Sequence, residues 1–135
     1  MNSSDMYREI ILDYWKNPRN KGIINNPTSS FKDSNPSCGD IIQVDLKINN
    51  NKIEDIKFSG DGCIISQASA SMLTEFIKNK TIDEAKNISR DDILMMLGIE
   101  LSGIRLKCAL LCFKVFKYAL YSYLGKSMED EVYDN

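Results

Sequence analysis

The chain contains no histidine among its 135 residues. This absence excludes Ser-His and Cys-His catalytic pairs, and it also excludes zinc or non-haem iron held by histidine. Any metal bound by side chains must therefore be held by cysteine and carboxylate groups.

An excess of positive charge is also missing, because 17 Lys and Arg face 19 Asp and Glu and leave a net charge of −2. The sequence offers no basic stripe to neutralise phosphates or anionic lipid, so we expect neither nucleic acid nor a membrane as partner. The first ten residues lack a basic region followed by an apolar core, and no apolar run approaches the ~20 residues of a membrane span. We therefore expect a cytoplasmic protein.

In a reducing compartment, the four cysteines are expected to act as metal-binding or reactive thiols, although an even number would also permit two disulfides. Neither a CxxC pair nor a zinc-finger spacing occurs among Cys38, Cys63, Cys108 and Cys112. The role of each cysteine can therefore be inferred only from its local sequence.

The length and a hydrophobic content of 43% predict a single packed domain over residues 1–135. Apolar spacing predicts α+β architecture: a small antiparallel sheet of about three strands, helices packed on it and a long C-terminal core helix. The expected elements are a helix at 5–15, a short edge strand near 30–32, a hairpin of strands 42–48 and 53–59, and helices at 65–79, 81–86, 89–97 and 104–124. Gly125 is expected to end the last helix and to leave a frayed acidic tail over 125–135.

Cys38 and Asp40 lie just before the first clear strand. Residues i and i+2 of an extended chain point to the same side, so this thiol and this carboxylate would converge. Gly39 between them leaves the backbone open to a metal or to a partner's sulfur. The alternative is a turn in which Asp40 is a solvated residue.

Cys63 follows Gly60-Asp61-Gly62 and begins a predicted helix, where the helix dipole lowers the pKa of a thiol. The alternative is a small apolar residue that fills a tight corner.

Cys108 lies near the beginning of the long apolar helix with Arg105 and Lys107 close to it, and these cations are expected to favour its thiolate. Cys112 lies one turn further within the apolar stripe and is predicted to be a buried core residue.

Three thiolates and one carboxylate form a plausible tetrahedral site for zinc or for the irons of a cluster. The four groups carry four negative charges, which helix N-termini and Lys107 or Arg105 would offset. One hard oxygen ligand is easier to displace than a thiolate, which suits a site that exchanges its contents.

The sequence closely resembles the NifU N-terminal family of iron–sulfur assembly proteins, which includes IscU-type scaffolds and SufU-type zinc-dependent sulfur acceptors. The resemblance covers nearly the whole chain. It rests on four motifs in order: residues 7–22, 37–40, 60–71 and 105–109.

The resemblance implies a SufE/NifU-like fold with helices against one face of the sheet and a metal site built from Cys38, Asp40, Cys63 and Cys108. It implies that a pyridoxal-phosphate cysteine desulfurase delivers persulfide sulfur to one of these thiols, with Cys38 as the first acceptor. Apo iron–sulfur proteins would then receive a [2Fe-2S] cluster or the sulfur itself. The role would be that of a scaffold or sulfur acceptor more than of a true enzyme.

Two features bear on the subfamily. Lys107 stands where IscU-type scaffolds carry a histidine, which favours the SufU-like side, whereas the short spacing between Cys63 and Cys108 is IscU-like. Residues 101–104 lack the proline-containing segment that IscU-type proteins present to an Hsp70 chaperone, which does not favour chaperone-driven release.

Three functions are therefore expected in this order. The first is a cluster-assembly scaffold with Asp40 as its labile ligand. The second is a zinc-bound sulfurtransferase that carries sulfur on Cys38. The third is a non-catalytic interaction module whose zinc stabilises the fold.

Overall fold

A computed structural model of the chain describes the backbone of residues 3–133 and the side chains of residues 5–125. Its three strands are β1 (Ser29–Asn35), β2 (Asp40–Asn49) and β3 (Lys52–Ser59). Its helices are α1 (Ser3–Lys16), α2 (Ile64–Ile77), α3 (Ile82–Lys86), α4 (Arg90–Leu97) and α5 (Ile104–Tyr133). The predicted α+β architecture is confirmed, and the edge strand is longer than the three residues expected.

The strands form one antiparallel sheet in the order β1-β2-β3. A tight turn joins β2 to β3, and Asn50 and Asn51 adopt φ angles of 52° and 60° there, as asparagine tolerates. The register pairs Val44 with Phe31 on one side and with Phe58 on the other. The hairpin predicted from alternating apolar residues is therefore confirmed.

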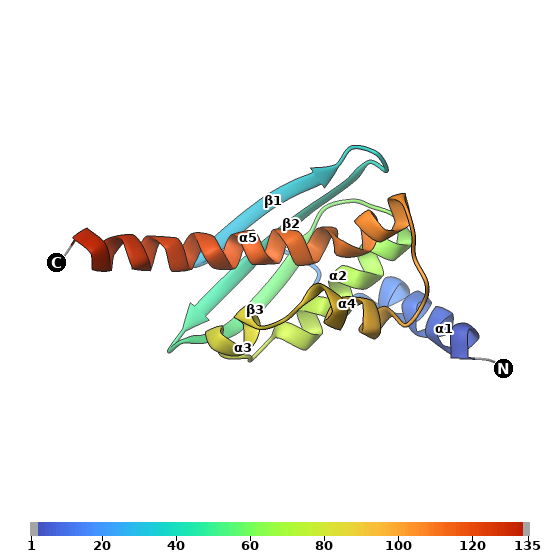
Figure 1. Ribbon diagram of the computed structural model, residues 1–135, viewed down its shortest axis with the longest axis horizontal. Coiled ribbons are helices and arrows are strands. Elements are labelled where there is room, and N and C mark those ends of the chain that lie inside the picture. The colour runs from blue at the N-terminus through green and yellow to red at the C-terminus, as the bar shows by residue number, and fades with distance from the viewer. Residues whose placement is uncertain (1–2, 134–135) are drawn as a thin grey trace.

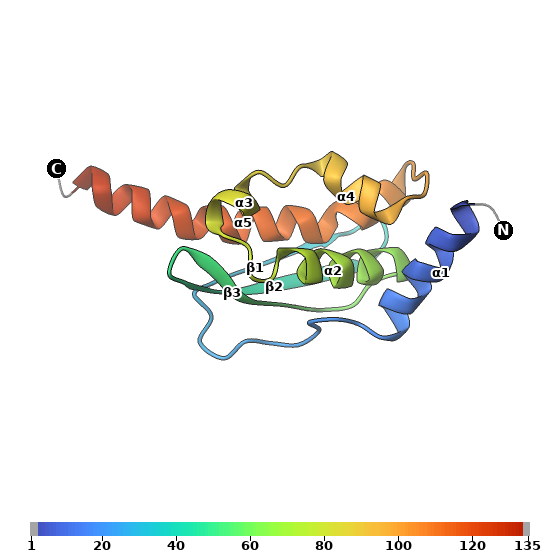
Figure 2. The same cartoon turned by 90° about the horizontal axis from the view of Figure 1, so that it is seen from below.

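Two helices cover one face of the sheet (Figure 2). Helix α5 packs against β1 and β2, whereas α2 packs against β3 and against α5. The core between these layers is built by inward residues of the strands and the apolar faces of both helices: Ile42, Val44, Leu46, Ile56, Phe58, Leu73, Ile77, Val115, Phe116 and Leu120. Helix α1 lies beside α2 at the end of the molecule near the start of α5 (Figures 1 and 2).

The chain between α1 and β1 crosses the other face of the sheet (Figure 2). Gly22 donates its backbone N–H to Phe58, and Thr28 donates its own to Leu46. Asp45 lies beneath this segment with 1% of its surface exposed, although the alternating pattern places it on the open face of β2. Its carboxylate accepts hydrogen bonds from Ile24 N and Ser30 Oγ, so the buried charge is satisfied.

Helix α5 continues past Gly125 to Tyr133, so the prediction that Gly125 ends it is wrong. A single glycine inside a helix costs only about 1 kcal/mol relative to alanine, and the packed turns before it offset that cost. The frayed tail expected over 125–135 lies mostly outside the residues whose side chains are described, so it stays a prediction. The single domain expected over 1–135 also stays a prediction. Within the described part of the chain, no helix is long and apolar enough to cross a bilayer.

Candidate metal centre and thiol cluster

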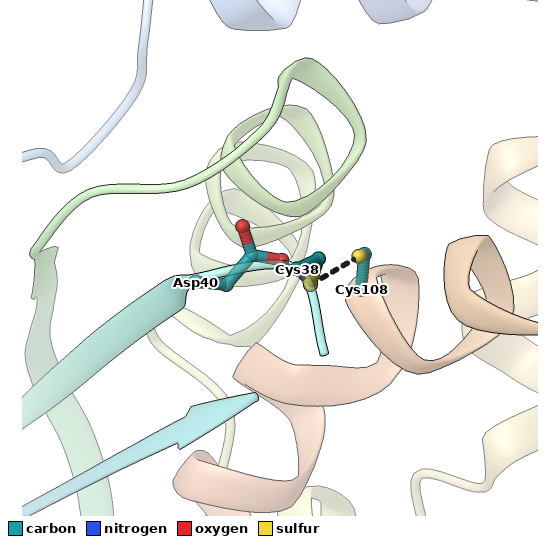
Figure 3. A group of neighbouring side chains, drawn as sticks. All are labelled: Cys38, Asp40 and Cys108. Atoms are coloured by element: carbon teal, nitrogen blue, oxygen red, sulfur yellow. Dashed lines mark hydrogen bonds between the residues drawn. The ribbon is translucent and has the colours of Figure 1, made fainter. Parts of the chain in front are cut away.

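Three cysteines and one aspartate meet where the sheet, α2 and α5 come together. Cys38 comes from the turn before β2, Asp40 from the first residue of β2, Cys63 from the residue before α2, and Cys108 from the second turn of α5. Figure 3 shows Cys38, Asp40 and Cys108 pointing toward one another. The structure thus brings together residues that are up to 70 positions apart in the sequence.

The turn that carries Cys38 is organised by Asn35. The backbone carbonyl of Asn35 accepts hydrogen bonds from the N–H groups of Cys38 and Gly39 at 3.2 and 3.0 Å, and its side-chain oxygen accepts one from Ser37 N at 3.2 Å. Gly39 has a φ of +72°, which an L-residue adopts only with strain, and an added Cβ there would meet no atom within 4 Å. The backbone at Gly39 therefore borders open space beside the cluster.

The convergence of Cys38 and Asp40 is confirmed, with 2.9 Å between Cys38 Sγ and Asp40 Oδ2. Its cause differs from the expectation, because residues 36–39 form a turn and not an extended chain. The turn folds the thiol back over the carboxylate. The sulfur of Cys38 also lies 2.8 Å from that of Cys108.

Asp40 is fully buried, with 0% of its surface exposed, so the alternative of a solvated residue is wrong. Its Oδ1 accepts a hydrogen bond from the backbone N–H of Cys63 at 2.9 Å. Burial opposes ionisation, but hydrogen bonds from Cys38, Cys108, Cys63 N and Ser66 outweigh it and lower the pKa of the Asp40 carboxyl. Asp40 is thus an anion whose described partners include no cation.

Cys63 is the N-cap of α2, as predicted, and its sulfur accepts a hydrogen bond from Ser66 N at 3.4 Å. The sulfur lies 3.8 Å from Asp40 Oδ2, so it stands at the edge of the cluster. Among the described residues, the compact group whose ligand atoms all lie within 4.8 Å of one another comprises Cys38, Asp40 and Cys108. Cys63 is exposed, whereas Cys108 is buried.

Gly62 makes this close approach possible. A Cβ at this position would lie 2.3 Å from Ser66 Oγ and 2.8 Å from Asp40 Oδ1. Any other residue would displace the groups that hold the carboxylate.

Burial raises the pKa of the Cys108 thiol, and the neighbouring Cys38 and Asp40 raise it further. The expectation that Arg105 and Lys107 favour the thiolate is therefore wrong, because burial and the neighbouring groups dominate the pKa of this thiol. Both cationic side chains are exposed, and water screens their charges.

Cys112 stays outside the cluster, in the core, with 1% of its surface exposed. Burial raises the pKa of its thiol to about 12. Its predicted role as a core residue is confirmed.

Two positioning residues, Asn35 and Ser66, are not among the site residues predicted from the sequence. Asn35 precedes a proline, which is a turn signal. Ser66 follows Cys63 by three residues, the spacing at which a backbone N–H meets an N-cap side chain.

The donor set fits a thiophilic divalent cation such as zinc. Two sulfurs and a buried carboxylate converge, with the sulfur of Cys63 at the edge of the group and no cation among the described residues to neutralise them. A bound cation would stabilise the thiolates, which burial disfavours at Cys108. The oxygen donor is the hard, exchangeable member of the set.

Comparison with known proteins identifies the family. The family model for the NifU-like N terminal domain matches residues 6–130, which is most of the chain. The chain belongs to the NifU-like N-terminal domain family. All four residues of the thiol cluster lie within the matched range.

Named relatives come from two branches. The zinc-dependent sulfurtransferase SufU of Bacillus subtilis (strain 168) is 39% identical, over 86% of this chain and 90% of SufU. The iron–sulfur cluster assembly scaffold protein IscU of Escherichia coli (strain K12) is 35% identical, over 89% of this chain and 95% of IscU.

A solved structure shares the fold. It is described as a candidate iron–sulfur cluster assembly scaffold protein for the SUF system of Fervidobacterium islandicum AW-1. Its TM-score is 0.73 at 32% identity, over 88% of this chain and 99% of that one.

Proposed function

We propose that this protein is an iron–sulfur cluster assembly scaffold, which accepts sulfur from a cysteine desulfurase and holds the growing [2Fe-2S] cluster as cargo on Cys38, Cys63 and Cys108. The observation that supports this most is the convergence of two thiols on a buried carboxylate with no cation among its described partners, and a third thiol, that of Cys63, 3.8 Å from the same carboxylate. The names of the IscU and SufU relatives support the same conclusion.

Cys38 is the proposed sulfur acceptor. It lies on a surface turn, half-buried, whereas Cys108 is buried within α5. Its thiolate would attack the outer sulfur of the persulfide on the desulfurase. A new S–S bond then forms on Cys38, the bond within the donor persulfide breaks, and the cysteine of the desulfurase leaves as a thiolate.

Asp40 is the proposed labile ligand. Its Oδ1 is held by the N–H of Cys63 while Oδ2 faces the thiols, so one oxygen anchors the side chain and the other can bind or release iron. Replacement by alanine should leave the three thiols in place and slow release of the cluster.

The experiment is anaerobic. The protein is incubated with a cysteine desulfurase, cysteine and ferrous iron and then desalted, and bound iron, acid-labile sulfide and zinc are quantified. Near-equal iron and sulfide with zinc displaced supports the scaffold, and Asp40→Ala should then hold its cluster longer than the parent does. Cys112→Ala is the matched control, because it removes a thiol outside the cluster and should not change either content.

A second candidate function is a zinc-dependent sulfurtransferase. The SufU relative of B. subtilis and the lysine at position 107 favour it. Zinc would then be resident on Cys38, Asp40, Cys63 and Cys108 and would lower the pKa of the thiols it binds. Retained zinc, absent iron and a persulfide on Cys38 would support this candidate, and full stimulation of the desulfurase by Cys38→Ser would contradict it.

A further inference from the structure

The sulfur of Cys38 faces a carboxylate and a second thiol (Figure 3). Its Sγ lies 2.9 Å from Asp40 Oδ2 and 2.8 Å from Cys108 Sγ. Under the proposed function, on which this inference rests, Cys38 gains a second sulfur atom. A hydropersulfide is a stronger acid than a thiol, so this outer sulfur carries negative charge near neutral pH. The anionic carboxylate of Asp40 repels it, and the outer sulfur therefore needs surroundings on another side of Cys38.

A cavity with cationic walls begins beside the turn that carries Cys38. Its volume is about 550 Å³, and Asn35 and Pro36, which precede Cys38 in the chain, form part of its wall. Helices α4 and α5 contribute three cations to the same wall: Arg90, Lys107 and Lys114. Among the described residues, no acidic side chain lines this cavity. Positive charge without a matching acid favours an anionic occupant.

The cations of this wall are available to an anion in the cavity. All three residues are exposed. Within the described side chains, Arg90 and Lys107 form no hydrogen bond or ion pair, while Lys114 contacts Asp33 at 3.0 Å. Leucine side chains form much of the remaining wall: Leu106, Leu110 and Leu111. A sulfur anion is larger and more weakly hydrated than an oxyanion, so it loses less hydration beside these apolar groups.

Asn35 contributes a buried hydrogen-bond donor that has no acceptor. The residue is 8% exposed, and its Oδ1 accepts a hydrogen bond from Ser37 N at 3.2 Å. Its Nδ2 is buried and has no partner among the described residues. Unpaired buried donors are rare in folded proteins, and one explanation is an ion that the site binds. The backbone carbonyl of Asn35 also accepts a hydrogen bond from Cys38 N, so this donor belongs to the turn that would carry the added sulfur.

We propose that this cavity is the binding site for the outer sulfur of a persulfide on Cys38. An S–S bond of about 2 Å lengthens the side chain, and rotation about its Cα–Cβ bond turns the outer sulfur away from Asp40 and toward the cavity. Asn35 Nδ2 then donates a hydrogen bond to the sulfur, and the cations of the wall balance its charge. The added sulfur is thereby held beside the thiol cluster until iron or a sulfur acceptor takes it.

Charge and hydrogen bonding, more than a close fit, hold the sulfur in this site. The cavity is far larger than one sulfur atom, so water shares the space with it. Water weakens the attraction between the sulfur and the exposed cations, and salt weakens it further. The site therefore slows attack on the outer sulfur without blocking it, and this difference in rate can be measured.

The test installs the persulfide chemically, so it does not need a desulfurase. The reduced full chain, freed of metal by a chelator, is treated with inorganic polysulfide. A cysteine thiolate takes one sulfur atom, and a shorter polysulfide leaves. After desalting, iodoacetamide forms an S–C bond to the outer sulfur and releases iodide. Peptide mass spectrometry then gives the labelling rates of the persulfides on Cys38 and Cys63, because the product keeps both sulfur atoms.

Two variants remove the two kinds of contact separately. Arg90→Gln with Lys114→Gln removes two charges from the wall. Asn35→Asp keeps an oxygen for Ser37 N and replaces only the unpaired donor, by an anionic oxygen. We expect the persulfide on Cys38 to be labelled at least threefold faster in each variant, because the outer sulfur is no longer held in the cavity. High ionic strength should accelerate labelling in the parent more than in the variant without the two charges.

The controls separate this site from a general effect of charge or of folding. Lys16→Gln with Lys47→Gln removes two charges at exposed sites elsewhere and should keep the parental rate. The persulfide on Cys63 is an internal control whose rate should stay the same in every variant. Circular dichroism checks that each variant is folded.

Parental labelling rates at Cys38 in both variants overturn the proposal, and so does an equal acceleration at Cys38 and Cys63. A Cys38 that takes no sulfur from polysulfide overturns it as well. The proposed function is tested apart from this, by delivery of sulfur from a desulfurase. Delivery to Cys38 with unchanged labelling rates refutes the sulfur site alone, whereas the expected rates without such delivery support the site and contradict the proposed function.

Discussion

Substitution of Gly62 by alanine tests whether the close approach beside Asp40 holds the cluster together. A Cβ at this position would lie 2.3 Å from Ser66 Oγ, 2.8 Å from Asp40 Oδ1 and 3.1 Å from Asp40 Cγ. Each distance is shorter than, or at the lower limit of, ordinary contact with a carbon atom, so both side chains must move. The φ of Gly62 is not in the left-handed region, so backbone strain does not complicate the result.

The expected loss of stability follows from the hydrogen bonds that must break or lengthen. Ser66 Oγ can rotate away only by losing its hydrogen bond to the Cys63 carbonyl, worth about 1 kcal/mol. The Asp40 carboxylate is held by Cys63 N, and a hydrogen bond to a charged group is worth about 1.5–3 kcal/mol, only part of which is lost in a small shift. Replacement of glycine by alanine also stabilises the protein by about 0.4–1 kcal/mol, because alanine restricts the unfolded chain. A net destabilisation of about 1–3 kcal/mol is expected, the range usual for overpacking.

Two assays measure this effect. Urea unfolding under reducing conditions with a chelator gives the free energy of unfolding of the metal-free protein. Competition with a chromophoric chelator gives the affinity for Zn²⁺, which should fall at least tenfold because Asp40 and Cys63 no longer lie where the other donors require them.

Gly125→Ala is the matched control. An added Cβ there meets no atom within 4 Å, and the residue lies inside α5, so the same chemical change should stabilise the protein by about 1 kcal/mol and leave zinc affinity unchanged. Ser66→Ala in the Gly62→Ala background removes the closest contact and should recover part of the lost stability. Unchanged unfolding and zinc affinity in Gly62→Ala would refute the reasoning.

Three further predictions concern positions outside the cluster. Gly98→Ala should destabilise the protein by about 1–3 kcal/mol in urea unfolding, because φ is +66° and the added Cβ would lie 2.3 Å from the Tyr7 ring. Tyr7→Ala in the same chain should relieve the clash with the ring but not the backbone strain at residue 98. The hydrogen bond from Tyr14 to Glu75 raises the pKa of Tyr14, so this bond stabilises the fold below pH 10 and is lost as the pH rises through the folded-state pKa. Tyr14→Phe should therefore lose less thermal stability than the parent as the pH rises above 10. An equal fall of the melting temperature with pH in both proteins would contradict this prediction. Cys112 should react with iodoacetamide at pH 8 more slowly than the half-buried Cys38 and the exposed Cys63, as followed by mass spectrometry, because burial raises its pKa to about 12; labelling of Cys112 as fast as that of Cys63 would show that the helix opens there.

The sequence alone determined the local elements. Alternating apolar residues in 42–48 and 53–59 produced the hairpin, and helical spacing produced α2 and the apolar part of α5. These patterns are decided within ten to twenty residues, so they can be read without knowledge of the fold. Gly125 marks the limit of such reading, because a weak local stop signal does not end a helix that is already packed over many turns.

The sequence also nominated Cys38, Asp40, Cys63 and Cys108 as candidates, through their positions at junctions between elements and through the family motifs. It could not predict how they meet. Cys108 shows why: its charged sequence neighbours are exposed, while burial and the groups brought in from β2 and the preceding turn raise its pKa.

Only the tertiary structure decided which atoms form the compact group. The Asn35 turn folds Cys38 over Asp40, and Gly62 lets α2 approach the carboxylate closely enough for Cys63 N to bind it. The burial of Asp45 beneath the segment that crosses the sheet likewise depends on tertiary contacts. The periodicity of apolar residues and the composition indicate which residues prefer water and which prefer the core. The pKa values and contacts of polar groups, in contrast, depend on partners that are distant in the sequence.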